Sequence, residues 1–227
     1  MANQLDLEEQ EQLAELKHFW REYGNLITWA LIVVFGAIAA WNGWNYWQNS
    51  QAGQAAAMYD EIERAAQAGE TDRVERAFSD LKERFGRTTY AQQAGLLAAA
   101  TLQSKGKTDA AKATLAWVAE KSPDEGYQAL ARIRLAGLLM DGKAYDEALK
   151  ALGAAFPREF EPLAADRRGD ILALQGKKAE AKAEYEKAYK GFDERSDYRR
   201  LVEVKLGALG ADPKQLAAPA AAAGAKS

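Results

Sequence analysis

The feature that most constrains the fold is a long stretch without charge. No Asp, Glu, Lys or Arg occurs between Glu22 and Asp60, although charged residues make up 28% of the 227-residue chain. Residues 26–47 are almost wholly apolar, and these 22 residues would form a helix of about 33 Å. The hydrocarbon core of a bilayer is roughly 30 Å thick and admits only backbone that pairs its own polar groups. We therefore predict one transmembrane helix, over residues 23–47.

Aromatic residues gather at both ends of this stretch. Indole and phenol rings settle at the headgroup level of a membrane, so their positions indicate two membrane–water interfaces. The side chains that we expect at these interfaces are Trp20, Tyr23, Trp41, Trp44 and Trp47.

A cleaved signal peptide is the alternative interpretation of the apolar stretch. Ala37-Ile38-Ala39 has the small-x-small form of a cleavage site. However, the segment that precedes the stretch is long and mainly acidic, whereas a signal peptide begins with a short basic region. The aromatic cluster also has a use only if it stays at an interface, so a retained anchor is favoured.

The orientation of the anchor follows from the basic residues that flank it. Lys17 and Arg21 lie just before the span, whereas the first base after it is Arg64. The positive-inside rule therefore favours a cytoplasmic N-terminus and an exported C-terminal domain. We predict a cytoplasmic segment over residues 1–22, a periplasmic domain over 48–210 and a disordered Ala-rich tail over 211–227.

Composition and single-residue counts exclude several functions. The net charge of −3 and the pI of about 5.5 argue against a nucleic-acid partner, which requires a basic face. There is no cysteine, and His18 is the only histidine, so we expect no disulfide, no metal site and no catalytic triad. We expect neither a cofactor nor a small-molecule substrate. A pair of catalytic carboxylates leaves little trace in sequence, so an enzyme stays open as a minor alternative.

The rest of the chain repeats itself and is composed mainly of helix-forming residues. Gly69, Gly106, Gly142 and Gly176 each separate two helical patterns, at spacings of 37, 36 and 34 residues. Large apolar residues follow three of these glycines by nine positions, and in the turn after Gly142 we predict one extra residue. We expect each glycine to supply the left-handed turn within a helical hairpin. The fold class that we predict is all-α, with one transmembrane helix followed by a helical solenoid.

The segment around Gly176 resembles a tetratricopeptide repeat. Gly169, Gly176, Ala181, Tyr185 and Ala188 match the family's spacing of small and aromatic residues. Each repeat of such an array buries its apolar face on its neighbours, so the array needs a cap at its end. For this cap we expect a final helix that contains Leu201, Val204 and Leu209. An irregular helical bundle is the alternative.

In such an array the first helices of the repeats line a groove that binds extended or helical peptides. By the repeat spacing, the polar residues that should face this groove are Gln93, Gln103, Arg132, Asp166 and Asp170. For each of them, a merely solvated position is the alternative.

The complete arrangement resembles the bacterial YfgM family, the ancillary subunit of the SecYEG translocon. The resemblance rests on the runs ELKHFWREYGNLI and WNGWNYWQNSQ on either side of the span, and on ADRRGDILALQGKKAEAKAEYEKA in the repeats. It implies a single-pass inner-membrane protein that acts as a non-enzymatic adaptor. Its partners would be the SecYEG translocon, the lipid bilayer and periplasmic chaperones, to which it would link translocating proteins.

Two other functions are compatible with the same pattern. The repeats could scaffold an envelope-assembly complex of the inner membrane that has no role in translocation. With the opposite orientation, they could act as a signalling adaptor in the cytoplasm. Only the bias of Lys17 and Arg21 separates these readings at the level of sequence.

Overall fold

The computed structural model describes residues 7–211, and the part of the expected tail from residue 212 onward lies outside these residues. The described secondary structure consists of nine α-helices and no strand, which confirms the all-α class. The chain divides into two compact units, one up to Gly53 and one from Gln54, and each is described by itself.

The first unit consists of helix α1 (Leu7–Ala68) as far as residue 53. Its apolar side chains are almost all exposed, and α1 is the one described helix that is long and apolar enough to cross a membrane. The hydroxyl of Thr28 donates a hydrogen bond of 2.7 Å to the carbonyl oxygen of Gly24. This bond pairs the hydroxyl within the helix, as lipid surroundings require.

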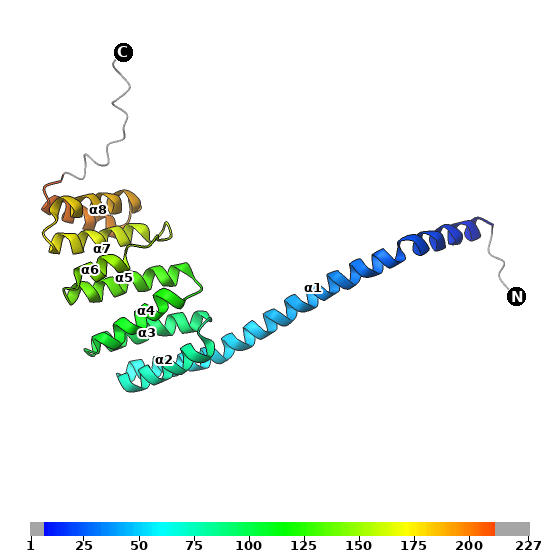
Figure 1. The fold of residues 1–227 in the computed structure, drawn as a ribbon, viewed down its shortest axis with the longest axis horizontal. Helices are drawn as coiled ribbons and strands as arrows, with labels where there is room; N and C mark the ends of the chain where they lie inside the picture. Colours follow the sequence, from blue (N-terminus) through cyan, green and yellow to red (C-terminus); the bar gives the residue numbers. More distant parts are fainter. Residues whose placement is uncertain (1–6, 212–227) are drawn as a thin grey trace, which may run out of the picture. The chain divides into compact units, whose positions relative to one another are not determined.

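The second unit is a stack of helical hairpins. The last turns of α1 pair with the helix that follows them, three further pairs come next, and one helix ends the array. These helices lie beside one another in chain order, from cyan to orange (Figure 1). Their bounds are α2 (Thr71–Phe85), α3 (Thr89–Ser104), α4 (Thr108–Lys121), α5 (Glu125–Asp141), α6 (Tyr145–Ala151), α7 (Glu161–Leu174), α8 (Lys178–Gly191) and α9 (Asp197–Ala208). We call α1 from residue 54, α3, α5, α7 and α9 the first helices, and α2, α4, α6 and α8 the second helices.

A left-handed residue ends each first helix, but not always the glycine that we expected. Gly69, Gly106 and Gly176 have φ values of +71°, +77° and +77°. In the third hairpin, Gly142 has a φ of −79° and Lys143 has the left-handed φ of +59°. The prediction that Gly142 supplies the left-handed turn was therefore wrong.

Backbone hydrogen bonds show why Lys143 takes this position. In the second hairpin, the N–H of Lys107, which follows the left-handed residue, donates to the carbonyl of Leu102 at 2.9 Å. In the third hairpin, the N–H of Ala144 donates to Leu139 at the same distance. This bond closes a Schellman-type turn around Lys143. Counted from Lys143, the third unit is in register with the others and contains no extra residue.

The core repeats in this corrected register. Four residues before each left-handed residue lies a buried apolar side chain, contributed by Ala65, Leu102, Leu139, Leu172 and Leu206. Seven residues before it, α3, α5 and α7 carry small residues, which let the paired helices approach closely. At Gly169 a Cβ atom would lie 2.5 Å from the ring of Tyr185, so this position admits no larger residue without movement.

Helix α9 confirms that a final helix follows the fourth hairpin, but it buries a different side from the one we expected. Val202 and Leu206 are fully buried, whereas Leu201 and Val204 are 50% and 69% exposed. Leu209, the third residue that we expected there, follows the helix and packs against the same cluster as Val202 and Leu206. Gly210 then has a φ of +74°, so α9 ends with the same left-handed turn as the first helices of the earlier hairpins. In its geometry α9 is thus the first helix of a fifth unit.

Candidate functional site

One side of every first helix contains no buried side chain. The positions are 13, 9, 6 and 2 residues before the left-handed residue, and this spacing places them on one side of a helix. Together, the residues at these positions form what we call the first-helix face. They are Ala56, Asp60, Glu63 and Gln67 on α1; Gln93, Leu97, Ala100 and Ser104 on α3; Leu130, Arg134, Gly137 and Asp141 on α5; Leu163, Arg167, Asp170 and Leu174 on α7; Asp197, Leu201, Val204 and Ala208 on α9.

The residues that the sequence assigned to a groove occupy different positions. Gln93 lies on the first-helix face, is exposed, and donates from Nε2 to the hydroxyl of Tyr127 at 3.0 Å. Gln103 is also exposed but lies just beside the face. Arg132 is half-buried, and its Nη2 donates to Oε1 of Gln128 at 3.2 Å. Because the register is counted from Lys143, Arg132 lies off the face.

Asp166 and Asp170 are the two predicted residues that the structure brings together. Lys205 of α9 donates from Nζ to both carboxylate oxygens of Asp166, at 2.7 and 2.8 Å, and lies 2.7 Å from Oδ1 of Asp170. The hydroxyl of Tyr185 donates to the same Asp170 oxygen at 2.8 Å. Burial raises the pKa of Asp166, and the hydrogen bond from Lys205 opposes that rise. These contacts join α7, α8 and α9.

The pair of Asp166 and Lys205 replaces an apolar contact between successive first helices. Asp166 lies ten residues before its left-handed residue, and Lys205 lies five before the next one. At the corresponding positions, Leu96 and Leu138 share one hydrophobic cluster, and Ile133 shares another with its partner on α7. Sequence reasoning missed Lys205. The signal that could have revealed it is a lysine at a position where two earlier units carry a leucine or an isoleucine.

A second ionic cluster holds the third and fourth hairpins together. Arg168 donates from Nε to Glu184 at 2.8 Å and from Nη1 to the carbonyl of Leu152 at 3.2 Å, and its Nη2 pairs with Glu161. All these groups are partners within the protein, so we assign the cluster to the stability of the array.

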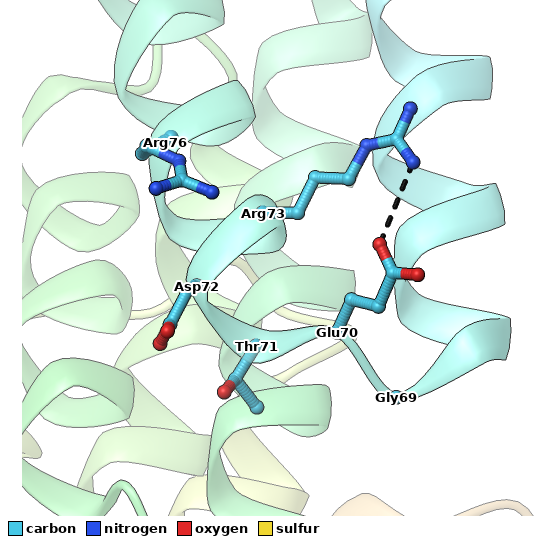
Figure 2. A pocket seen from close by; sticks show the side chains of 6 residues that line it. All are labelled: Gly69, Glu70, Thr71, Asp72, Arg73 and Arg76. Carbon is cyan, nitrogen blue, oxygen red and sulfur yellow. Dashed lines mark hydrogen bonds and ion pairs between the residues drawn. The ribbon is translucent and has the colours of Figure 1, made fainter.

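The first hairpin turn forms a shallow pocket, lined by Gly69, Glu70, Thr71, Asp72, Arg73 and Arg76 (Figure 2). Arg73 points toward Glu70 and pairs with it at 3.4 Å, and it also pairs with Glu61 at 3.1 Å. Asp72 pairs with Lys107 of the next turn. These ion pairs occupy most of the pocket's charges, and the pocket offers no arrangement for catalysis. Among the described residues, no group of three or more acidic or histidine side chains could hold a metal ion.

In the first unit, all the aromatic residues expected at membrane interfaces are exposed. Trp20 and Tyr23 precede the apolar stretch, and Trp41, Trp44 and Trp47 lie at its end. The rings of Trp44 and Trp47 are 5.4 Å apart. Their placement at a membrane surface stays a prediction.

A family model described as a tetratricopeptide repeat-like domain matches residues 17–211. The match covers most of the chain, so the repeat-like fold is shown by homology as well as by geometry. No solved structure matches the chain.

Three relatives align with this chain over most of their own length. The ancillary SecYEG translocon subunit of Neisseria gonorrhoeae is 33% identical over 89% of this chain and 98% of its own length. The proteins of the same name from Haemophilus influenzae and Escherichia coli are 28% and 27% identical, over 80% and 88% of this chain and 89% and 96% of their own lengths. The chain therefore belongs to the family of ancillary SecYEG translocon subunits.

Proposed function

We propose that the protein is a membrane-anchored, non-enzymatic adaptor that associates with the SecYEG translocon and links translocating proteins to periplasmic chaperones. The observation that carries this proposal is the first-helix face, a side of the repeat array on which no residue is buried, in a chain that also has a candidate span. The family name and the repeat fold point to a protein that binds other proteins and does not catalyse a reaction.

The mechanism that we propose is tethering. Residues 23–47 would anchor the chain in the inner membrane, with residues 1–22 in the cytoplasm and the repeats of 48–210 in the periplasm. A tether raises the effective concentration of a weakly binding partner, so modest contacts on the first-helix face would suffice near the channel exit.

Topology is the first test. A reporter that is active only outside the cytoplasm is fused after Leu209, and a second fusion carries at the N-terminus a reporter that is active only in the cytoplasm. We expect activity from both. An inactive C-terminal reporter on a stable, membrane-bound fusion would place the repeats in the cytoplasm and refute the proposal.

Site-specific crosslinking tests the adaptor role. A photo-crosslinking residue at Ala100, which is exposed on the first-helix face, should capture proteins during export. The control position is Ala113, which is equally small and exposed but lies on the second helix α4. Capture of envelope-assembly proteins alone, without translocon or exported chains, would favour the scaffold alternative.

A further inference from the structure

The first-helix face has an acidic end on α1. Asp60 and Glu63 are both exposed there, and among the described residues neither carboxylate takes part in an ion pair, whereas neighbouring Glu61 is paired with Arg73. Arg64 donates to the backbone carbonyl of Asp60. Burial raises the pKa of Tyr59, and the negative charges of Glu63 and Asp60 add to that rise. Two carboxylates that are free to pair thus lie at the start of the face.

The opposite end of the face is mainly apolar, and its one charged residue on α9, Asp197, is paired with Arg200 at 3.4 Å. Leu174 on α7 is 58% exposed, and Leu201 and Val204 on α9 are 50% and 69% exposed. Together with Tyr198, these are the exposed large apolar side chains among the described residues of the second unit. Leu201 and Val204 are three residues apart and therefore lie on the same side of α9. Neighbouring apolar side chains that are exposed to water mark a candidate binding site.

Between these ends the face is almost neutral. On α3 its side chains are uncharged, and on α5 Arg134 and Asp141 have opposite charges. On α7, Arg167 lies 3.9 Å from Asp170 and pairs with it. The charge and the apolar area of the face are therefore separated along the array, with unpaired acid at the α1 end and exposed aliphatic side chains at the α9 end.

We propose that this face binds an extended, unfolded polypeptide segment with Lys or Arg side chains at one end and aliphatic side chains at the other. The inference rests on the proposed adaptor function and names the class of segment that the adaptor selects. The cationic end would pair with Asp60 and Glu63, and charge complementarity sets which segments bind and in which orientation. The aliphatic end would cover Leu174, Leu201 and Val204 and remove their surface from water.

The array also sets the length of the segment. Packed helices lie about 8–10 Å apart, so the four steps from α1 to α9 span roughly 32–40 Å. An extended chain advances about 3.3 Å per residue, which gives a segment of about a dozen residues. A segment about half that long would reach only one of the two ends and should bind more weakly.

The test uses the full-length protein in nanodiscs of zwitterionic lipid, with empty nanodiscs as the background, and follows fluorescence anisotropy of three labelled peptides of about a dozen residues. The first has Lys at one end and Leu and Val at the other, the second has Glu in place of Lys, and the third has Ser and Thr in place of Leu and Val. Each peptide is made in both directions. We expect the first peptide to bind at least tenfold more tightly than the other two, in one direction.

Charge reversal of the protein gives the matched variant. Asp60→Lys with Glu63→Lys should invert the preference, so that the Glu peptide binds more tightly than the Lys peptide. The control is Asp80→Lys with Glu83→Lys, which makes the same change at the same spacing on exposed positions of the second helix α2. That control should leave the preference unchanged.

The outcomes separate this inference from the proposed function. If the Lys and Glu peptides bind equally well, or if reversal at Asp60 and Glu63 leaves the preference unchanged, the inference is wrong while peptide binding by the adaptor stands. If none of the peptides binds above the empty-nanodisc background, both the inference and the proposed binding of unfolded segments fall.

Discussion

The third hairpin turn offers a prediction in which the sequence and the structure disagree about a single position. The sequence singles out Gly142 as the turn residue, but the structure gives the left-handed backbone to Lys143, with a φ of +59°. A side chain that is held in this region strains the backbone, and glycine removes the strain. We therefore expect Lys143→Gly to stabilise the protein, although glycine loses more backbone freedom on folding than any other residue.

The magnitude follows from two opposing contributions. A left-handed conformation costs a non-glycine residue about 1–2 kcal/mol. The extra freedom that glycine gives the unfolded chain costs about 0.5–1 kcal/mol. At the midpoints of these ranges the net gain for Lys143→Gly is about 0.75 kcal/mol, or a rise in Tm of about 2–3 °C for a domain of this size. Gly142→Ala should be neutral or slightly stabilising, because the new Cβ would lie 3.5 Å from the nearest backbone oxygens, an ordinary contact.

The assay is denaturant unfolding of the full-length protein in detergent micelles, followed by circular dichroism. Lys143→Ala is the control for loss of the side chain, because it keeps the left-handed strain and should leave stability nearly unchanged. Gly106→Ala is the opposite control: it has open space around it and a φ of +77°, so it should lose about 1 kcal/mol through backbone strain alone. A loss of stability in Lys143→Gly, or a loss at Gly142→Ala as large as that at Gly106→Ala, would refute the assignment of the turn.

Three further predictions concern packing and ion pairs in the second unit. Lys205→Ala should destabilise the protein by about 3 kcal/mol, because Asp166 stays buried without its cation. Replacing both Asp166 and Lys205 by leucine should restore most of this loss. Equal losses of stability in the single and the double variant, measured by denaturant unfolding, would contradict the prediction. Gly169→Ala should cost about 2 kcal/mol because its Cβ would lie 2.5 Å from a tyrosine ring, while Gly137→Ala, with nothing within 4 Å, should be neutral or stabilising in thermal unfolding. Burial raises the pKa of Glu184, but hydrogen bonds from two basic side chains outweigh it and hold that pKa below its ordinary 4.5. The charge of Glu184 therefore stabilises the fold above pH 4.5, and this effect is lost as the pH falls through the lower folded pKa. The stability that Glu184→Gln loses at neutral pH should accordingly shrink in acid. A difference in stability that does not change with pH would contradict this prediction.

The sequence alone determined the membrane-spanning candidate and the existence of the repeats. An uncharged stretch long enough to cross a bilayer has few other uses, because its length and composition both follow from the solvent that surrounds it. Helical hairpins are also local: their apolar periodicity and their turn residues lie within a few tens of positions of one another. Gly69, Gly106 and Gly176 could therefore be assigned to turns from spacing alone.

Tertiary structure decided the features that depend on contacts between units. Glycine adopts either sign of φ, so the presence of Gly142 could not show that the closing hydrogen bond of the turn would place Lys143 in the left-handed position. Helix α9 has more apolar residues than it buries. Its packing against α8 decides that Val202 and Leu206 are buried and Leu201 is exposed. Lys205 and Asp166 lie 39 residues apart in the chain. The apolar periodicity of a helix does not show which side chain of a neighbouring helix it contacts, so this ion pair could not be predicted from the sequence. The residues of the first-helix face could be assigned only after these contacts had set the register of the repeats.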